Sequence, residues 1–168
     1  MLLNKKETLY CGLDLYPPAH IIGNLEKGIP FGDASFDTVV ALDVLEHTDN
    51  IHEAFKELCR VARKNVLITL PNVYEIKSRI RFLLGKQLSG KYGLPSNFQR
   101  DRHRWFFSLQ EARTFIHEMG RLQEFEVETE GCIVGPHRGF AGGWRLVNLF
   151  PNLLSPCYVV FLVHRKIA

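Results

Sequence analysis

The sequence predicts an open, mostly parallel α/β sheet. An apolar run at Thr38–Leu42, an amphipathic stretch at Ile51–Ala62 and a second apolar run at Asn65–Leu70 follow one another as strand, helix and strand. Such βαβ crossovers are nearly always right-handed, and runs that are apolar on both faces are typical of central parallel strands. With 168 residues, 46% of them hydrophobic, the chain is long enough to bury one core, so we expect a single domain over residues 1–168.

Two short strands precede this unit. Leu9–Leu15 is mostly apolar and is stopped by Pro17 and Pro18, and Ala19–Leu25 reads as the next strand. The few residues between the two strands are too few for a helix. Gly28–Asp37 is rich in Gly, Pro and Asp, which predicts a loop before the strand at Thr38.

The helix at Ile51 has the clearest signals of the chain. Asn50 is a suitable N-cap, and Glu53 follows it at the spacing of a capping box. Apolar residues then recur on a single stripe, at Ile51, Ala54, Phe55, Leu58, Cys59 and Ala62.

The segment after the second apolar run predicts a helix and a long loop. In Val73–Leu84 the spacing places four apolar residues inward, namely Ile76, Ile80, Leu83 and Leu84. Gly85–Arg104 contains Gly, Ser and Pro, and a loop of that length in a compact domain usually has a function.

The last third predicts a helix followed by strands. Ser108 and Glu111 form a second capping box, and Gly120 is a suitable residue to end that helix. Phe125–Val134 and Tyr158–Arg165 read as strands, with a helical Arg145–Leu154 between them. Because no standard crossover helix joins these strands, we expect an antiparallel C-terminal hairpin.

Composition excludes several classes of protein. The cysteines, Cys11, Cys59, Cys132 and Cys157, form no CxxC pair and lie in or beside apolar stretches. They indicate reduced, buried thiols of a cytoplasmic protein and no metal site. No apolar run reaches the roughly 18 residues of a membrane span, and residues 1–8 contain no signal-peptide core.

Ligands of open α/β sheets bind outside the carboxyl ends of the strands, so the polar residues at those ends are candidates for binding. Asp14 ends the first strand, where a carboxylate can accept two hydrogen bonds from a ribose diol. It can equally be a turn residue before Pro17. The other polar residues at such ends are Asn24, Asp43 and Asn72.

Several segments together resemble a known family. They are GLDLYPP at Gly12–Pro18, SFDTVVALDVLEH at Ser35–His47, RVARKNVLITLPN at Arg60–Asn72, and HRWFFSLQEARTFIHEMG at His103–Gly120. In this order they resemble the class I S-adenosylmethionine-dependent methyltransferases, and most closely the type 11 family. The resemblance implies a Rossmann-like sheet with helices on both faces, and an insert over residues 73–107 on the substrate side.

The resemblance also implies a cofactor, S-adenosylmethionine, and residues that would hold it. Asp14, with Leu15 beside it, would bind the ribose hydroxyls. Asn24 would face the adenine amino group with Leu25 packing beside it, and Asp43 and Val44 would border the methionine part and the reacting methyl. Glu46 and His47 are typical of the family, either as residues that hold the turn or in a direct role.

The sequence departs from the family at its N-terminus. The family's first strand and glycine-rich loop normally lie about 20 residues before the acid of the second strand. Here 13 residues precede Asp14, and they include one glycine, Gly12. We therefore expect a sheet that lacks the usual first strand and helix. Either the chain is a truncated form of a longer enzyme, or the short form binds the cofactor poorly or not at all. Backbone groups left unpaired by the missing strand would be covered by a homodimer or by a rearranged sheet.

A basic stretch points to the acceptor. Between Ile76 and Trp105 there are eight Lys or Arg and one acid, Asp101. It is either a solvated face or a surface for an anionic acceptor, with Arg102, Arg104 and Trp105 as candidate substrate-binding residues. The position of the insert favours a small-molecule or lipid-linked acceptor over a nucleic acid. Trp144–Leu154 could add peripheral membrane contact, although core packing explains it as well.

The sequence thus predicts methyl transfer from S-adenosylmethionine. The sulfonium leaving group needs no acid, so catalysis would depend on alignment, with a base only for an acceptor that loses a proton. His47 and His103 are the candidate bases. The alternatives are a catalytically inactive, methyltransferase-like scaffolding protein and a nicotinamide-dependent enzyme.

Overall fold

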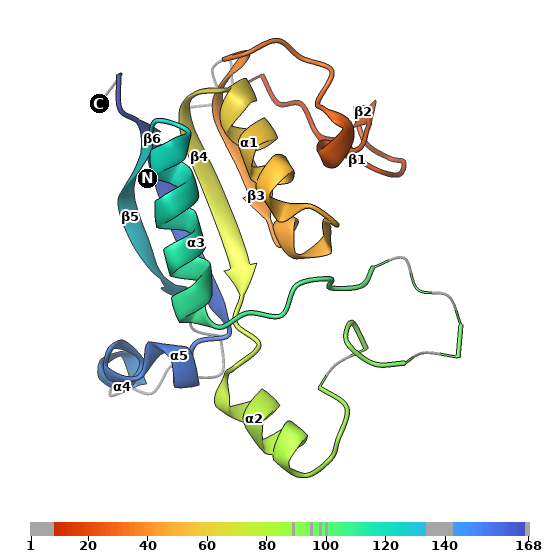
Figure 1. Ribbon diagram of the computed structural model, residues 1–168, viewed down its shortest axis with the longest axis vertical. Coiled ribbons are helices and arrows are strands. Elements are labelled where there is room, and N and C mark those ends of the chain that lie inside the picture. The colour runs from red at the N-terminus through yellow and green to blue at the C-terminus, as the bar shows by residue number, and fades with distance from the viewer. Residues whose placement is uncertain are drawn as a thin grey trace.

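The computed structural model describes residues 9–88, 90–94, 96–97, 99, 101–133 and 143–166. Its main sheet has the strand order β3 (Phe36–Leu42), β4 (Ala62–Pro71), β6 (Cys157–His164) and β5 (Phe125–Ile133) (Figure 1). β3 and β4 are parallel, whereas β6 runs antiparallel to both β4 and β5, so β6 alone is reversed. The predicted open, mostly parallel α/β sheet with an antiparallel C-terminal hairpin is confirmed.

Helices α1 (Ile51–Val61) and α3 (Leu109–Leu122) begin where the capping signals predict. The side chain of Asn50 accepts a hydrogen bond from Glu53 N–H at 3.2 Å. At α3, Ser108 Oγ accepts from Glu111 N–H at 3.2 Å while a Glu111 carboxylate oxygen accepts from Ser108 N–H at 2.7 Å. Both helices lie in front of the main sheet in Figure 1, so they cover the same face.

The core lies between these two helices and the sheet. Phe55 of α1 is completely buried, and its ring meets Phe115 of α3 edge to face at 5.7 Å. On the opposite face of β3, Val40 and Leu42 are each 55% exposed. The expectation of helices on both faces is therefore not met by the described residues: the two helices that pack on the main sheet share one face.

β3 has an open edge. It pairs with β4 along one side, and within the described residues no strand pairs with its other side. The two-residue strands β1 (Leu13–Asp14) and β2 (Ile21–Ile22) form a separate parallel pair, followed by the short 3₁₀ helix η1 (Leu25–Lys27). The expected lack of a first strand stays a prediction, because residues 1–8 lie outside the described part of the chain.

Helix α2 (Ile76–Leu83) differs from its prediction. The predicted inward residues Ile80, Leu83 and Leu84 are 49%, 84% and 60% exposed, and no residue of the helix is buried. The predicted helix is confirmed, but α2 stands away from the sheet (Figure 1), and no residue of the described helix is buried. The short helices α4 (Gly143–Leu149) and α5 (Pro151–Leu154) lie near this end of the molecule.

Gly120 has another role than the one predicted. α3 does not end there but continues to Leu122. A Cβ at position 120 would lie 3.1 Å from Leu162 Cδ2 and 3.3 Å from the Phe125 carbonyl oxygen. The glycine thus allows α3 to approach β6 closely.

The four cysteines are free thiols, as expected, but only Cys59 is buried, and Cys11 is exposed. No helix in the described part of the chain is both long and apolar enough to cross a membrane.

Candidate functional site

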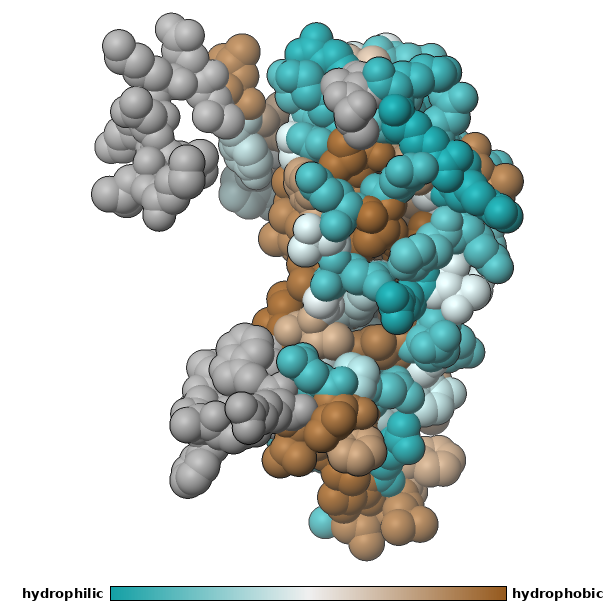
Figure 2. All heavy atoms as spheres, turned by 90° about the vertical axis from the view of Figure 1, so that its left-hand side faces the viewer, coloured by the Kyte–Doolittle hydropathy of each residue, from teal (hydrophilic) through white to brown (hydrophobic). Residues whose placement is uncertain are grey.

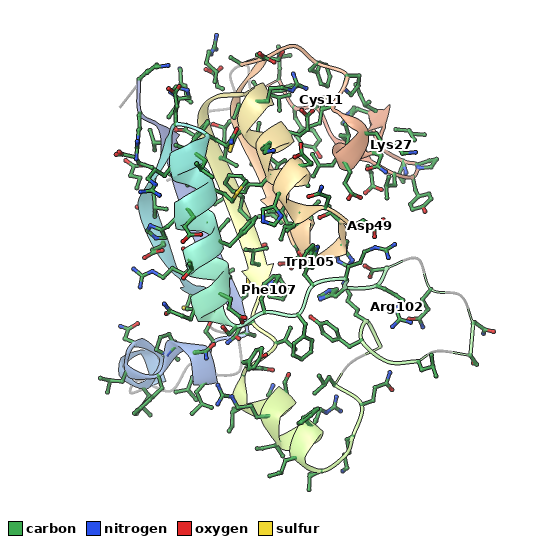
Figure 3. All side chains as sticks on the ribbon, in the orientation of Figure 1. Cys11, Lys27, Asp49, Arg102, Trp105 and Phe107 are labelled. Atoms are coloured by element: carbon green, nitrogen blue, oxygen red, sulfur yellow. The ribbon has the colours of Figure 1, made fainter. Side chains whose placement is uncertain are left out.

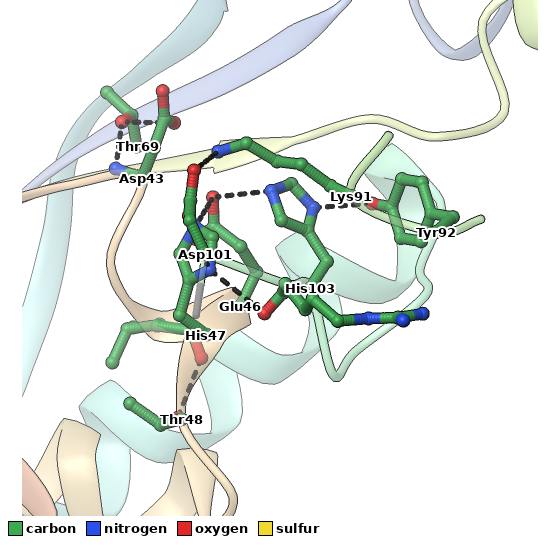
Figure 4. Close-up of polar contacts among 11 residues, drawn as sticks. Asp43, Glu46, His47, Thr48, Thr69, Lys91, Tyr92, Asp101 and His103 are labelled. Carbon is green, nitrogen blue, oxygen red and sulfur yellow. Dashed lines mark hydrogen bonds and ion pairs between the residues drawn. The ribbon is translucent and has the colours of Figure 1, made fainter. Parts of the chain in front are cut away.

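The site begins with a tight turn at the carboxyl end of β3. Asp43 has a φ of 52°, which turns the chain into the 3₁₀ helix η2 (Leu45–His47). Thr69 of β4 holds this turn, since its Oγ1 accepts from Asp43 N–H at 2.9 Å and donates to Asp43 Oδ1 at 2.8 Å (Figure 4). The buried Leu45 anchors η2 in the core, so the turn has a fixed position.

The end of the long loop docks onto η2. Arg104 N–H donates to the Glu46 carbonyl oxygen at 2.8 Å, and Trp105 Nε1–H donates to the Thr48 carbonyl oxygen at 2.7 Å. His47 Nδ1 lies 3.0 Å from the Arg102 carbonyl oxygen. These contacts join segments more than 50 residues apart in sequence, and they place His103 beside Glu46 and His47.

Glu46, His47 and His103 form the centre of the site, and we call them the Glu46–His47–His103 cluster. Glu46 Oε1 lies 3.9 Å from Nε2 of each histidine. The two imidazole rings are 4.6 Å apart at an interplanar angle of 87°. Glu46 is completely buried, whereas the side chains of His47 and His103 are 24% and 8% exposed.

Outer contacts hold both histidines. Tyr92 Oη lies 2.6 Å from His103 Nδ1, on the side of the ring away from Glu46 (Figure 4). Asp101 Oδ1 lies 3.2 Å from His47 Nδ1, and the other oxygen of Asp101 contacts Lys91 Nζ at 3.1 Å. The Nδ1 side of each ring is therefore committed to the protein, while the Nε2 side faces Glu46.

Burial shifts the pKa of two members of the cluster in the direction that favours their uncharged forms. It raises the pKa of Glu46 to about 7, and the charge of Asp43 acts in the same direction. Burial also lowers the pKa of His103 to about 4, with His47 adding to the effect. His103 is thus a neutral imidazole near pH 7, and a neutral imidazole can be a ligand or accept a proton.

The remaining predicted cofactor residues belong to the β1–β2 unit. Asp14 ends β1 with an exposed carboxylate, one oxygen of which accepts from Tyr16 N–H at 3.0 Å. Asn24 caps η1, and its Oδ1 accepts from Glu26 N–H at 2.9 Å. Leu25 is buried in the core, whereas Leu15 is 52% exposed. Asp43 and Val44, by contrast, lie beside the Glu46–His47–His103 cluster, and Val44 is 38% exposed.

The predicted substrate-binding residues make contacts within the protein. An Arg102 guanidinium nitrogen donates to the Gly93 carbonyl oxygen at 2.7 Å, and Arg104 Nε pairs with Asp49 Oδ1 at 2.6 Å. The Trp105 side chain packs against the core (Figure 3). All three secure the loop, and their contact with a substrate stays a prediction. Lys91 and Tyr92 belong to the basic stretch predicted as a candidate surface for the acceptor, but nothing local links them to residues 46–47.

The comparisons with known proteins agree with this fold. Residues 5–70 match the model of a family described as a methyltransferase domain, of type 11. A search of curated proteins finds no significant match.

Three solved structures are similar over most of this chain. A putative S-adenosylmethionine-dependent methyltransferase of Listeria monocytogenes has a TM-score of 0.56 at 9% identity, over 92% of this chain and 78% of that one. A possible histamine N-methyltransferase of Thermotoga maritima has a TM-score of 0.51 at 17% identity, over 86% and 62%. A magnesium protoporphyrin IX methyltransferase of Synechocystis PCC 6803, solved with S-adenosylhomocysteine, has a TM-score of 0.50 at 12% identity, over 84% and 49%.

The chain spans only 62% and 49% of the Thermotoga and Synechocystis enzymes. At these identities the likeness concerns the fold. The family match contains both Asp14 and Asp43, the acidic residues that end β1 and follow β3. This chain therefore has the fold of the class I S-adenosylmethionine-dependent methyltransferases, and its residues 5–70 match the type 11 methyltransferase domain.

Proposed function

We propose that the chain is a methyltransferase module that binds S-adenosylmethionine at the carboxyl ends of β1 and β3. The observation that carries the proposal is the exposed carboxylate of Asp14 at the end of β1, inside the matched methyltransferase segment. One of its oxygens is held by Tyr16 N–H, which orients the carboxylate and leaves lone pairs for a ribose diol.

The residues present fit the adenosine half of this cofactor. Asp14 supplies the acceptor for the ribose, and the half-exposed side chains of Leu15, Tyr16 and Ile22 offer apolar surface for a base. The methionine half is different, because no described residue forms a glycine turn beside a strand end. We propose that a further strand on the open edge of β3 completes that half.

When bound, S-adenosylmethionine supplies a methyl group on a sulfonium. The leaving group is a neutral thioether, which needs no proton. The protein's task is then to hold the acceptor in line. For an acceptor that loses a proton, His47 is the more accessible candidate base, since its side chain is 24% exposed against 8% for His103.

Titration calorimetry with S-adenosylhomocysteine tests the proposal. We expect saturable binding, weakened about tenfold in Asp14→Asn, because a charged acceptor for the ribose is lost. Glu128→Gln, which changes an exposed carboxylate on β5, is the matched control and should bind as the wild type does. Absence of binding at millimolar ligand would favour the alternative of an inactive, methyltransferase-like scaffold.

For the acceptor, the observations favour a lipid-linked molecule at an anionic membrane surface. The lower end of the molecule, where α2, α4 and α5 lie, is rich in apolar side chains (Figure 2). In and after α2, Phe82, Leu83 and Leu84 are 76%, 84% and 60% exposed. Residues 76–90 contain four cationic side chains and no acid. Exposed apolar and cationic groups on one short helix are suited to anionic lipid.

Co-sedimentation with phosphatidylserine-containing vesicles tests this assignment. We expect binding that weakens with salt and falls about tenfold in the double variant Phe82→Ser and Leu83→Ser, because each apolar side chain contributes to insertion. Leu122→Ser is the matched control, since Leu122 is 67% exposed but lies on α3. If the wild-type protein does not co-sediment with anionic vesicles, the result would favour a small, soluble acceptor instead.

A further inference from the structure

The Glu46–His47–His103 cluster contains buried polar atoms without partners. Within the described part of the chain, both carboxylate oxygens of Glu46 and Nε2 of His103 are buried and make no hydrogen bond. At 3.9 Å, Glu46 Oε1 is too far from either imidazole for a hydrogen bond. Leaving such groups unsatisfied costs free energy, so three of them side by side need an explanation.

The outer contacts determine which ring nitrogen of His47 is free to bind. A carbonyl oxygen only accepts, so His47 Nδ1, 3.0 Å from the Arg102 carbonyl oxygen, carries the proton. Its Nε2 then has a lone pair on the side of Glu46. His103 has the same arrangement when its Nδ1–H donates to Tyr92 Oη at 2.6 Å. Two imidazole lone pairs and one carboxylate then face a common space between them.

We propose that Glu46, His47 and His103 bind a divalent transition-metal ion of the Zn²⁺ type. Their ligand atoms all lie within 4.8 Å of one another, and Glu46 Oε1 is 3.9 Å from each Nε2. A tetrahedral ion with bonds of about 2.0–2.1 Å holds its ligands about 3.4 Å apart. Glu46 Oε1 and each Nε2 therefore need to close in by about half an ångström, and a pair at the 4.8 Å limit by about 1.4 Å, which rotation of the three side chains can supply.

The surroundings of the cluster have the features of a metal site. Asp101 lies on the far side of the His47 ring, and Tyr92 on that of His103, which is how outer groups orient metal-binding imidazoles. The charged groups that face the cluster are Asp43, Asp101 and Lys91. Together with Glu46 they leave an excess of negative charge, which favours a cation.

The ligand types select the ion. Two imidazoles and one carboxylate suit Zn²⁺, Fe²⁺ or Co²⁺, whereas Mg²⁺ and Ca²⁺ prefer oxygen ligands throughout. Three protein ligands leave a position for water, and the partial exposure of His47 gives solvent a path to it. With an ion bound, both Nε2 lone pairs are used, so His47 and His103 act as ligands and not as free bases.

Titration with Co²⁺, followed by its visible absorption, and with Zn²⁺ by calorimetry tests the proposal. Both are done on the Cys11→Ser protein, because Cys11 is an exposed thiol that could bind metal by itself. We expect one Co²⁺ per chain with an intense tetrahedral spectrum. Glu46→Gln and His103→Ala should each weaken binding at least about 100-fold, and Tyr92→Phe about tenfold. His52→Gln, an exposed histidine on α1, is the control and should leave the affinity unchanged.

The result that would overturn the proposal is equal affinity in the wild type, Glu46→Gln and His103→Ala, with circular dichroism showing all three folded. Mg²⁺ in place of Co²⁺ should give no binding at the same concentration. Because the readout is metal binding, it is independent of the S-adenosylhomocysteine titration, and either proposal can fail while the other stands.

Discussion

Replacing Glu46 with leucine is expected to raise the free energy of unfolding by about 1–3 kcal/mol when a chelator is present. The carboxyl group of Glu46 is completely buried, and neither oxygen has a hydrogen-bond partner in the described part of the chain. Leucine has a similar volume and no polar atom, so it removes this desolvation cost without opening a cavity. Urea denaturation of both proteins in the presence of a chelator measures the difference.

Saturating Zn²⁺ should reverse the order of the two proteins. An ion that binds only the folded wild type at 1,000 times its dissociation constant stabilises it by about 4.1 kcal/mol, which exceeds the advantage of the leucine variant, and the leucine variant gains nothing. Glu118→Leu, at an exposed position of α3, is the control and should change stability by no more than about 0.5 kcal/mol. A leucine variant that is less stable than the wild type in chelator would mean that Glu46 is satisfied in solution.

Replacing Phe55 with alanine is expected to lower the free energy of unfolding by about 3–5 kcal/mol. Phe55 is 0% exposed and lies in the core where α1 meets α3, with its ring 5.7 Å from that of Phe115. The change removes buried apolar surface and leaves a cavity between two helices that are held by their own caps and cannot collapse into it. Since small domains have about 5–15 kcal/mol in all, much of the stability should be lost.

Thermal unfolding followed by far-ultraviolet circular dichroism measures this loss. Leu122→Ala also shortens a large apolar side chain on a helix, but Leu122 is 67% exposed, so its effect should stay within about 0.5 kcal/mol. Equal effects of the two substitutions would show that Phe55 does not lie in a tightly packed core.

Elements whose signals are local could be predicted from the sequence. The start of α1 at Asn50 and of α3 at Ser108 depends on residues three positions apart, and both N-caps form as expected. The capping box is complete only at α3, because Asn50 N–H donates to Glu26 Oε1 at 2.6 Å and not to Glu53. Gly120 shows the limit of this approach, because its role depends on the distance between α3 and Leu162, which no local pattern encodes. The predicted burial of the apolar side of α2 is wrong for a related reason. The periodicity indicates a helix but not whether another element packs against its apolar side.

The site was predictable in part. The sequence predicts His47 and His103 as separate candidate bases, each from its position beside the predicted pocket. Their meeting depends on the docking of residues 101–105 onto η2, through hydrogen bonds that join distant segments. The burial of Glu46 follows from the same docking. The sequence therefore indicated candidate bases, whereas the three-dimensional arrangement indicates a ligand set.

The small size of the β1–β2 pair has a consequence for the thermodynamics of binding. Each strand has two residues, and the pair is closed by backbone hydrogen bonds such as Ile21 N–H to the Gly12 carbonyl oxygen at 3.0 Å. An isolated two-stranded pair is marginally stable in water, so this unit should open locally far more often than the main sheet, with rapid amide exchange. Asp14 belongs to this unit. Binding of a nucleoside there must order the β1–β2 pair and so loses conformational entropy. Association should therefore show an unfavourable entropy and an affinity that falls steeply on warming.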